Sequence, residues 1–302
     1  MSGHNKRDFT SFDSMSGAEI LAILDLAAQQ KAEPHSYQTA KVMQGRIAGI
    51  FFEKASLRTR LSFETAVCQL GGNCTYMGPE SGRIGEREAI KDFAKVASRY
   101  LDVFILRTYK HETVTEVARH ASKPVINGLS DAHHPCQALG DLLTIREKLG
   151  ALKNVKVAFV GDCNNVCRSL AQALPKVGAA LTIASPRGYS FSEAFVKTAG
   201  VKLVNDPAEA VAGAAVVYTD VWASMGQENE VAKRRAIFQL YQLNSELLST
   251  APKALVMHCL PAHRGDEITD AVMDGPQSVV YDQAENRLHA QRALLCNLLG
   301  PV

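Results

Sequence analysis

The sequence predicts an α/β protein with two domains, each built on a parallel sheet with helices on its faces. The chain has 302 residues, which is enough for two domains of ordinary size. Apolar runs of strand length alternate along it with helical segments, the pattern of parallel sheets flanked by helices. The hydrophobic content of 46% and the charged content of 21% are typical of a water-soluble globular protein.

The first half of the chain contains one alternating series. Residues 16–30 are predicted as a helix, because Ser16 and Glu19 have capping-box spacing and apolar residues follow at helical intervals. A second helix is expected to begin near Thr59. Three buried runs are predicted as strands, at residues 46–53, 101–107 and 124–128.

The second half contains another alternating series behind a long helix, predicted from His134 to Leu149. Its expected strands are residues 155–161, 179–184, 216–219, 255–258 and 279–282, and residues 286–300 are expected to form a last helix. No Gly/Ser linker separates the halves, so the long helix itself is predicted to bridge two domains, residues 1–148 and 149–285. The last helix is expected to pack back on the first domain.

Composition excludes several classes of function. Lys and Arg outnumber Asp and Glu by 33 to 31, so the chain lacks the excess of basic residues expected of a protein that binds nucleic acid or a membrane surface. No run approaches the roughly 18 apolar residues of a membrane helix.

The N-terminal residues and the cysteines indicate a location. The first residues are polar and lack a signal-peptide core. The seven cysteines show no paired spacing, which fits a reducing compartment. A cytoplasmic location is therefore predicted.

An anion site is predicted after the strands of the first half. Ligands of open α/β sheets bind beyond the carboxyl ends of the strands, where helix N-termini offer unbonded N–H groups. Ser56, Arg58 and Thr59 follow the first strand, and an arginine fork matches phosphate oxygens in pairs. On this segment alone, a solvated helix start explains the residues equally well.

Two more strands of the first half end at residues of the same chemical type. Arg107 ends the second strand, and His134 and Gln137 follow the third at a spacing that lets both donate to one oxygen. The pair His133–His134 could indicate a metal, but no Cys, Asp or Glu neighbours stand at ligand spacing. No metal site is predicted.

The strands of the second half are followed by residues suited to an amino acid. The segment 161–165 lacks both the dinucleotide and the ATP phosphate-loop patterns, so no cofactor is predicted. Asp220 and Ser224 offer a cradle for an ammonium and a carboxylate, although a surface loop is an equal alternative for this segment. Cys259 beside His258 could suggest a cysteine protease, but no oxyanion-hole glycines surround it.

These residues form blocks that resemble the signature blocks of the ornithine carbamoyltransferases. The blocks follow one another along nearly the whole chain, and five in order are far more specific than any one of them. They are Ser56-Leu-Arg-Thr-Arg60, His134-Pro-Cys-Gln137, Asp220-Val-Trp-Ala-Ser-Met-Gly226, His258-Cys-Leu-Pro261 and Asp282-Gln-Ala-Glu-Asn-Arg287.

The resemblance implies a set of site residues. Carbamoyl phosphate would be held by Ser56, Leu57, Arg58, Thr59, Arg83, Arg107, His134, Gln137, Cys259, Leu260 and Arg287. Ornithine would be held by Asn165, Asp220, Ser224 and Met225. Catalysis would fall to Arg107, His134, Asp220 and Cys259, without metal or organic cofactor.

The resemblance also implies two α/β domains bridged by two helices, one domain for each substrate, and homotrimers with shared active sites. The sequence departs from the family pattern at two positions. Leu57 stands where the family commonly has Thr, and its backbone N–H can still donate. Arg83 stands where these enzymes usually carry Gln, at a position that reaches into a neighbouring subunit's site.

The implied reaction transfers the carbamoyl group of carbamoyl phosphate to the δ-amine of ornithine, giving citrulline and phosphate. Two alternatives belong beside it. A relative could act on putrescine or N-acetylornithine, although Asp220 with Ser224 favours a substrate with a free α-amino group. A protein of the same fold could also bind ligands without catalysis, but every residue of the implied site except Leu57 and Arg83 matches the family pattern.

Overall fold

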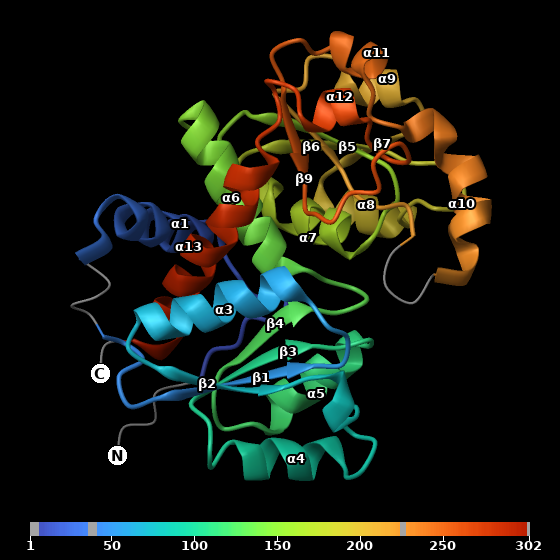
Figure 1. The fold of residues 1–302 in the computed structure, drawn as a ribbon. Coiled ribbons are helices and arrows are strands. Elements are labelled where there is room, and N and C mark those ends of the chain that lie inside the picture. The colour runs from blue at the N-terminus through green and yellow to red at the C-terminus, as the bar shows by residue number, and fades with distance from the viewer. Residues whose placement is uncertain (1–5, 36–40, 224–227, 301–302) are drawn as a thin grey trace. The chain divides into compact units, whose positions relative to one another are not determined.

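The fold comes from a computed structural model that describes residues 6–35, 41–223 and 228–300 (Figure 1). The chain forms two compact units: Met1–Met15, Glu19–Gly140 and Arg287–Val302 make the first, and Ser16–Ala18 and Asp141–Asn286 the second. Helices α6 (Pro135–Leu149) and α13 (Val280–Leu299) each contribute residues to both units. The division falls inside α6, between Gly140 and Asp141, whereas the sequence analysis placed it after residue 148.

The first unit contains a parallel sheet in the order β2-β1-β3-β4. Its strands are β1 (Ile47–Phe52), β2 (Asn73–Met77), β3 (Val103–Arg107) and β4 (Val125–Leu129). Phe52 lies opposite Arg107 in the register of β1 and β3, so the residues that follow these two strands emerge at the same edge. Phe9 continues the sheet by a parallel bridge to Ile126 of β4.

Helices cover both faces of this sheet (Figure 1). Helices α4 (Ile90–Ala97) and α5 (His111–His120) bury their apolar residues with Phe51, Phe104 and Leu106 in one core. Helix α3 (Leu57–Gln69) lies on the opposite face and buries Phe63. Helix α1 (Gly17–Ala32) and the short 3₁₀ helix η1 (Pro79–Ser81) complete the unit's named elements.

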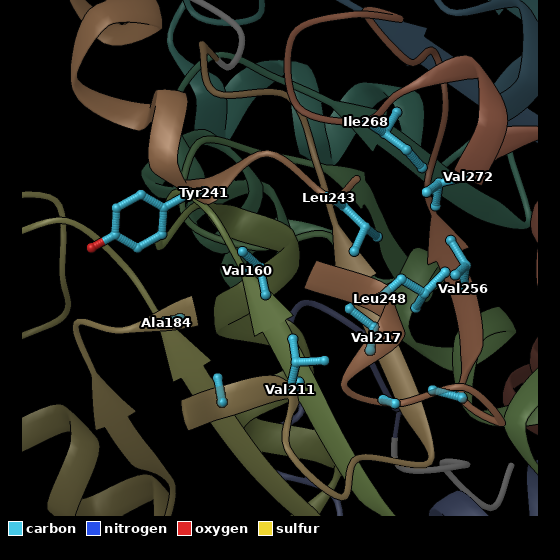
Figure 2. Close-up of a cluster of buried hydrophobic side chains, with 14 of the residues drawn as sticks. Val160, Ala184, Val211, Val217, Tyr241, Leu243, Leu248, Val256, Ile268 and Val272 are labelled. Atoms are coloured by element: carbon cyan, nitrogen blue, oxygen red, sulfur yellow. The ribbon is translucent and has the colours of Figure 1, made fainter. Parts of the chain in front are cut away.

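The second unit contains a parallel sheet in the order β7-β6-β5-β8-β9. The strands are β5 (Lys156–Val160), β6 (Ala180–Ala184), β7 (Lys202–Val204), β8 (Val216–Thr219) and β9 (Leu255–His258). The helices are α7 (Asn165–Ala173), α8 (Glu193–Ala199), α9 (Pro207–Val211), α10 (Val231–Phe238), α11 (Ser245–Ser249) and α12 (Asp270–Met273), with 3₁₀ turns η2 (Pro175–Val177), η3 (Glu228–Glu230) and η4 (Gln239–Tyr241). Figure 2 shows how valines of β5, β8 and β9 meet Leu243, Leu248 and Ile268 in one buried cluster.

The predicted fold class is confirmed, and one predicted strand is wrong. Residues 279–282 were expected to form a strand because two valines stand together, but α13 begins at Val280. Val279 donates its backbone N–H to Val256 of β9 at 3.0 Å, and the chain then turns into the helix. Within the described residues, no helix is both long and apolar enough to cross a membrane.

Candidate active site

A polar cluster in the first unit begins at the N-terminus of α3. Ser56 is the N-cap residue, and its extended backbone (φ −153°) turns the chain into the helix. Its hydroxyl donates to Thr59 Oγ1 at 3.1 Å, and the Thr59 side chain is buried. Leu57, by contrast, is 71% exposed, so only its backbone N–H can serve an anion here. The first turn therefore offers N–H groups and the half-buried Arg58 to a negative charge.

Arg287 of α13 joins this cluster across a long sequence separation. Its Nη1 donates to Gln137 Oε1 at 2.8 Å and its Nη2 to Thr59 Oγ1 at 3.3 Å. With its amide oxygen facing Arg287, Gln291 accepts from Nη2 at 3.0 Å and from Nε at 3.2 Å. A Cβ added at Gly140 would lie 3.3 Å from the Arg287 backbone nitrogen, so the glycine permits the close approach of α6 and α13.

His134 lies buried beside the arginines of the same cluster. Burial lowers its pKa well below 6.5, and the charges of Arg287 and Arg107 lower it further. The imidazole is therefore neutral at physiological pH and carries one N–H that can donate to an oxygen. Because both guanidiniums act on His134, Arg107 belongs to the same electropositive site as Arg287.

Arg107 is positioned by the backbone at the end of β3. Its carbonyl oxygen accepts the Glu53 N–H at 2.8 Å. The Glu53 carboxylate accepts the Tyr109 N–H at 2.8 Å. These two bonds tie the ends of β1 and β3 together, so Arg107 leaves the sheet from a fixed backbone.

Arg83 is exposed and packs against its own chain. Its guanidinium carbon lies 4.6 Å from the centroid of the Tyr109 ring, and its backbone N–H donates to Glu86 Oε2 at 3.0 Å. Tyr109 stands two residues after Arg107. The loop that carries Arg83 is thus joined to the segment that follows β3.

A second cluster, in the second unit, gathers around the buried carboxylate of Asp220. Asn164 is the N-cap residue of α7: its Oδ1 accepts from the backbone of Val166 and Cys167, and its Nδ2 donates to Asp220 Oδ2 at 2.7 Å. Asp220 Oδ1 accepts from its neighbour's N–H, that of Val221, at 2.8 Å. It also accepts from Cys259 Sγ at 2.9 Å. The carboxylate is therefore held by donors from the turn before α7 and from the segments that follow β8 and β9.

His258 beside Cys259 has both ring nitrogens engaged. Nδ1 accepts the Leu260 N–H at 2.9 Å, so the proton is on Nε2, which donates to Glu267 Oε1 at 2.9 Å. Asp220, His258 and Cys259 hold potential ligand atoms within 4.8 Å of one another, as a metal site would require. Because neither nitrogen of His258 has an unused lone pair, this arrangement fits a hydrogen-bond network better than a metal site.

An ion pair lies beside the Asp220 cluster. Arg234 Nη1 stands 3.2 Å from Asp162 Oδ2, and both side chains are buried. Burial raises the pKa of Asp162 to about 6, against the opposing effect of Arg234, and the nearby Asp220 raises it further. Arg234 also donates to the Trp222 carbonyl oxygen at 2.9 Å, which holds the chain just after Asp220.

The sequence-predicted site residues therefore fall into two groups. In the first unit, hydrogen bonds link Ser56, Thr59, Gln137 and Arg287. The charges of Arg107 and Arg287 act on His134, which adds these residues to the same group. Cys259 and Leu260 lie in the second unit with Asp220, and Asn165 is the first residue of α7. Ser224 and Met225 lie outside the described residues.

Two models of one protein family, and full-length relatives, match this chain over nearly its whole length. Residues 7–147 match the "Aspartate/ornithine carbamoyltransferase, carbamoyl-P binding domain" and residues 153–298 the "Asp/Orn binding domain" of the same name. The ornithine carbamoyltransferase of Pyrococcus abyssi is 47% identical over 98% of this chain and 96% of its own. The anabolic ornithine carbamoyltransferase of Pseudomonas aeruginosa is 48% identical over 96% of each. This chain belongs to the aspartate/ornithine carbamoyltransferase family.

Solved structures of ornithine carbamoyltransferases share the fold. The enzyme from Pyrococcus furiosus superimposes with a TM-score of 0.94 at 44% identity, covering 100% of both chains. The enzyme from Thermus thermophilus gives 0.90 at 43% identity, over 97% of this chain and 98% of the other. The two family domains correspond closely to the two compact units, except that α13 beyond Asn286 belongs to the first unit.

Sequence reasoning missed several residues that shape these carbamoyltransferase-family clusters. Asn164 was passed over for its neighbour, although an Asn just before a helix is a capping signal. Asp162 is the second residue after the end of β5, and ligands of such sheets bind at the ends of the strands. Glu267 and Gln283 accept hydrogen bonds from His258, from its ring and its backbone N–H respectively. They lie nine and 25 residues away in the sequence, so no local sequence pattern indicates these contacts.

Proposed function

We propose that the protein transfers the carbamoyl group of carbamoyl phosphate to the δ-amine of L-ornithine, giving L-citrulline and phosphate. One observation carries the proposal: each family domain coincides with a cluster of matching chemistry. The carbamoyl-P domain holds arginines and a neutral histidine at a helix N-terminus, and the Asp/Orn domain holds a buried carboxylate with a thiol. The relatives named above are all ornithine enzymes, which supports ornithine over aspartate.

The first unit is proposed as the carbamoyl-phosphate-binding domain. The phosphate would take the N–H groups of the first turn of α3 with the side chains of Ser56, Arg58 and Thr59. Arg107 and the neutral His134 would donate to the carbamoyl oxygen as negative charge develops on it. Arg287, fixed by Gln137 and Thr59, would add positive charge without having to reorganise. Leu57 would contribute its backbone N–H.

The second unit is proposed as the ornithine-binding domain. The attacking δ-amine must be neutral, and a desolvated site beside cations lowers an amine's pKa. Asp220 accepts the Cys259 S–H and would orient the amine without a covalent intermediate. Asn165, Ser224 and Met225 would hold the rest of the amino acid, and Leu260 would reach the carbamoyl group with Cys259. We propose no metal or organic cofactor, because these groups supply each step.

A homotrimer with shared active sites, a cytoplasmic location and a role in arginine biosynthesis complete the proposal. The resemblance to the ornithine carbamoyltransferases implies that position 83 reaches a neighbouring subunit's site, which supports the trimer. Relatives from Pyrococcus furiosus and Pseudomonas aeruginosa carry the name anabolic, which supports the biosynthetic role.

The proposal is tested by assaying candidate amines side by side with carbamoyl phosphate. We expect kcat/KM for ornithine to exceed that for putrescine or aspartate by at least ~100-fold. Polar groups left unpaired by the wrong substrate cost about 1–3 kcal/mol each. N-acetylornithine serves as the third competitor, since it lacks the free α-amino group. Comparable turnover of putrescine would exclude the role proposed for Asp220, and no turnover with any amine would point to a binding protein.

A further inference from the structure

Strand β9 lies at an edge of its sheet, so the backbone N–H groups on its outer side need partners from elsewhere. The N–H of Val256 donates to the carbonyl oxygen of Gln277 at 2.8 Å. Two residues later, the N–H of His258 donates to Oε1 of the Gln283 side chain at 2.9 Å. The side chain of Gln283 therefore takes the place of a neighbouring strand at the last residue of β9.

The amide of Gln283 is fixed from its other side as well. Its Nε2 donates to Asp141 Oδ1 at 2.7 Å and to the Tyr218 hydroxyl at 3.0 Å. All three side chains are buried, and Gln283 is only 1% exposed. A rotated amide would turn its oxygen toward the Asp141 carboxylate and its NH₂ group toward the His258 N–H, so the buried environment permits one orientation.

Gln283 binds both strands that lead to the Asp220 cluster. Strands β8 and β9 stay paired up to their last residues, and Asp220 and Cys259 are the residues that follow. The bond from Cys259 Sγ to Asp220 Oδ1 thus forms just beyond the ladder of the sheet. Because Gln283 contacts Tyr218 of β8 and His258 of β9, it sets how the two strand ends stand to each other.

We propose that Gln283 is a positioning residue, which holds the end of β9 so that the Cys259 thiol reaches Asp220. Asp141 and Tyr218 in turn hold its amide in the orientation that this requires. Gln283 is too deeply buried to touch a substrate, so it acts through Cys259 and Asp220. Its effect on ornithine binding rests on the proposed function, whereas its hold on Cys259 does not.

A pair of substitutions tests the role of the amide. Gln283→Glu keeps an acceptor for the His258 N–H but brings a second carboxylate against the buried Asp141, and two such groups cannot both ionise. We expect the KM for ornithine to rise by about tenfold or more and the KM for carbamoyl phosphate to stay within a few-fold. Adding Asp141→Asn supplies a new amide that donates to the new carboxylate, so the double variant should recover most of the loss. A double variant no better than Gln283→Glu would refute this pairing.

Two further variants separate positioning from general stability. Gln277→Met is the matched control at the same edge: it removes side-chain bonds to the carbonyl oxygens of Ala251 and Ala254, at 3.2 and 2.7 Å, and should leave both KM values unchanged. Tyr218→Phe removes one partner of Gln283 but keeps the ring stacked on Phe159, so it tests the proposal even if Gln283→Glu fails to fold. We expect it to raise the ornithine KM by a few-fold. Equal rises of both KM values in Tyr218→Phe, or a rise of the same size in Gln277→Met, would overturn the proposal.

Alkylation of Cys259 tests its position without any substrate. The thiol is half-buried, and release from Asp220 should expose it. After brief treatment of the folded protein with iodoacetamide, trypsin releases residues 254–264, which contain only Cys259, and residues 61–83, which contain only Cys68 and Cys74. We expect Cys259 to react at least severalfold faster in Gln283→Glu and at about the native rate in the double variant, with the control peptide unchanged.

The two readouts distinguish a failure of the positioning role from a failure of the proposed function. An unchanged alkylation rate of Cys259 in Gln283→Glu and Tyr218→Phe would overturn the positioning role, whatever the substrate is. A faster alkylation of Cys259 without any rise in the ornithine KM would instead refute the link between this thiol and ornithine binding.

Discussion

The thiol of Cys259 donates to Asp220 Oδ1 at 2.9 Å. It is one of three donors that hold this buried carboxylate, together with the side chain of Asn164 and the N–H of Val221. Cys259 thereby has a role that needs no bond to the substrate. The thiol fixes the carboxylate that would orient the attacking amine.

Replacement of Cys259 separates a hydrogen-bonding role from a nucleophilic one. Cys259→Ser keeps a donor for Asp220, so we expect measurable activity with a higher KM for ornithine. Cys259→Ala removes the donor and should raise that KM further, by about tenfold or more, since an unsatisfied buried group costs about 1–3 kcal/mol. Steady-state kinetics with ornithine varied measures both effects. A carbamoylated Cys259 trapped during turnover by mass spectrometry would contradict direct transfer.

Arg287 provides a second test, because its guanidinium bridges two partners from different helices. Arg287→Lys cannot donate to Gln137 and Thr59 in the same fork geometry, so we expect the KM for carbamoyl phosphate to rise by about tenfold or more. Arg235→Lys is the matched control: Arg235 pairs with Asp266 at 2.7 Å but is exposed, and such pairs contribute about 0–1 kcal/mol. Equal kinetics in the two variants would exclude Arg287 from the anion site.

The sequence predicts the buried parts of this fold well, because their apolar runs carry the signal. The buried residues of β1 and β3 are all apolar. The ranges predicted for these two strands differ from the observed ranges by at most two residues at either end. The strand β2, Asn73–Met77, was missed because its residues are polar or half-exposed. Residues 279–282 were misread as a strand, because adjacent valines favour strands locally while the bond from Val279 to Val256 starts a helix.

The candidate site was predicted in part, for a similar physical reason. Residues at or just after the end of a strand, such as Arg107 and Asp220, can be found from the strand pattern alone. The bond between Arg287 and Gln137 joins residues 150 positions apart, and no local pattern indicates it. The contact between Arg83 and the Tyr109 ring likewise joins residues 26 positions apart, and no local pattern indicates it.

The pKa of His134 predicts how stability depends on pH. Burial and two arginines hold the native pKa well below 6.5, so the unfolded chain binds a proton there that the native state does not. Stability should therefore fall as pH drops below about 6.5, by up to about 1.4 kcal/mol per pH unit from this residue, and level off below the native pKa. Urea denaturation of the native protein and His134→Gln over this range measures the difference. Parallel pH dependences in the two proteins would show that folding does not lower the pKa of His134.

Arg107 is expected to act mainly in the transition state. Arg107→Leu should lower kcat by roughly 10²–10³, the loss expected for one donor to a developing oxyanion. Arg119→Leu, a change of the same kind at an exposed position near the end of α5, is the control for folding and expression. A kcat for Arg107→Leu within a few-fold of the native value would make Arg107 a structural arginine held by the strand end.

Arg83 allows two roles that kinetics can distinguish. Its stacking on Tyr109 at an exposed site contributes about 0.5–1 kcal/mol, and loss of that contact alone would loosen the loop. In the proposed trimer, the same arginine would add a charge-assisted bond of about 1.5–3 kcal/mol to carbamoyl phosphate in a neighbouring site. The second role predicts that Arg83→Ala raises the KM for carbamoyl phosphate by about tenfold or more and changes the KM for ornithine little.

Two further variants complete the test of Arg83. Arg83→Gln should recover part of the loss, because an amide can still donate to phosphate. Tyr109→Leu removes the stacking partner but keeps the charge, so it should leave the KM for carbamoyl phosphate within a few-fold of the native value. Increasing salt should weaken carbamoyl-phosphate binding in the native protein more than in Arg83→Ala, since screening acts on the added charge. If Tyr109→Leu and Arg83→Ala instead raise this KM equally, the arginine acts by holding its own loop through Tyr109.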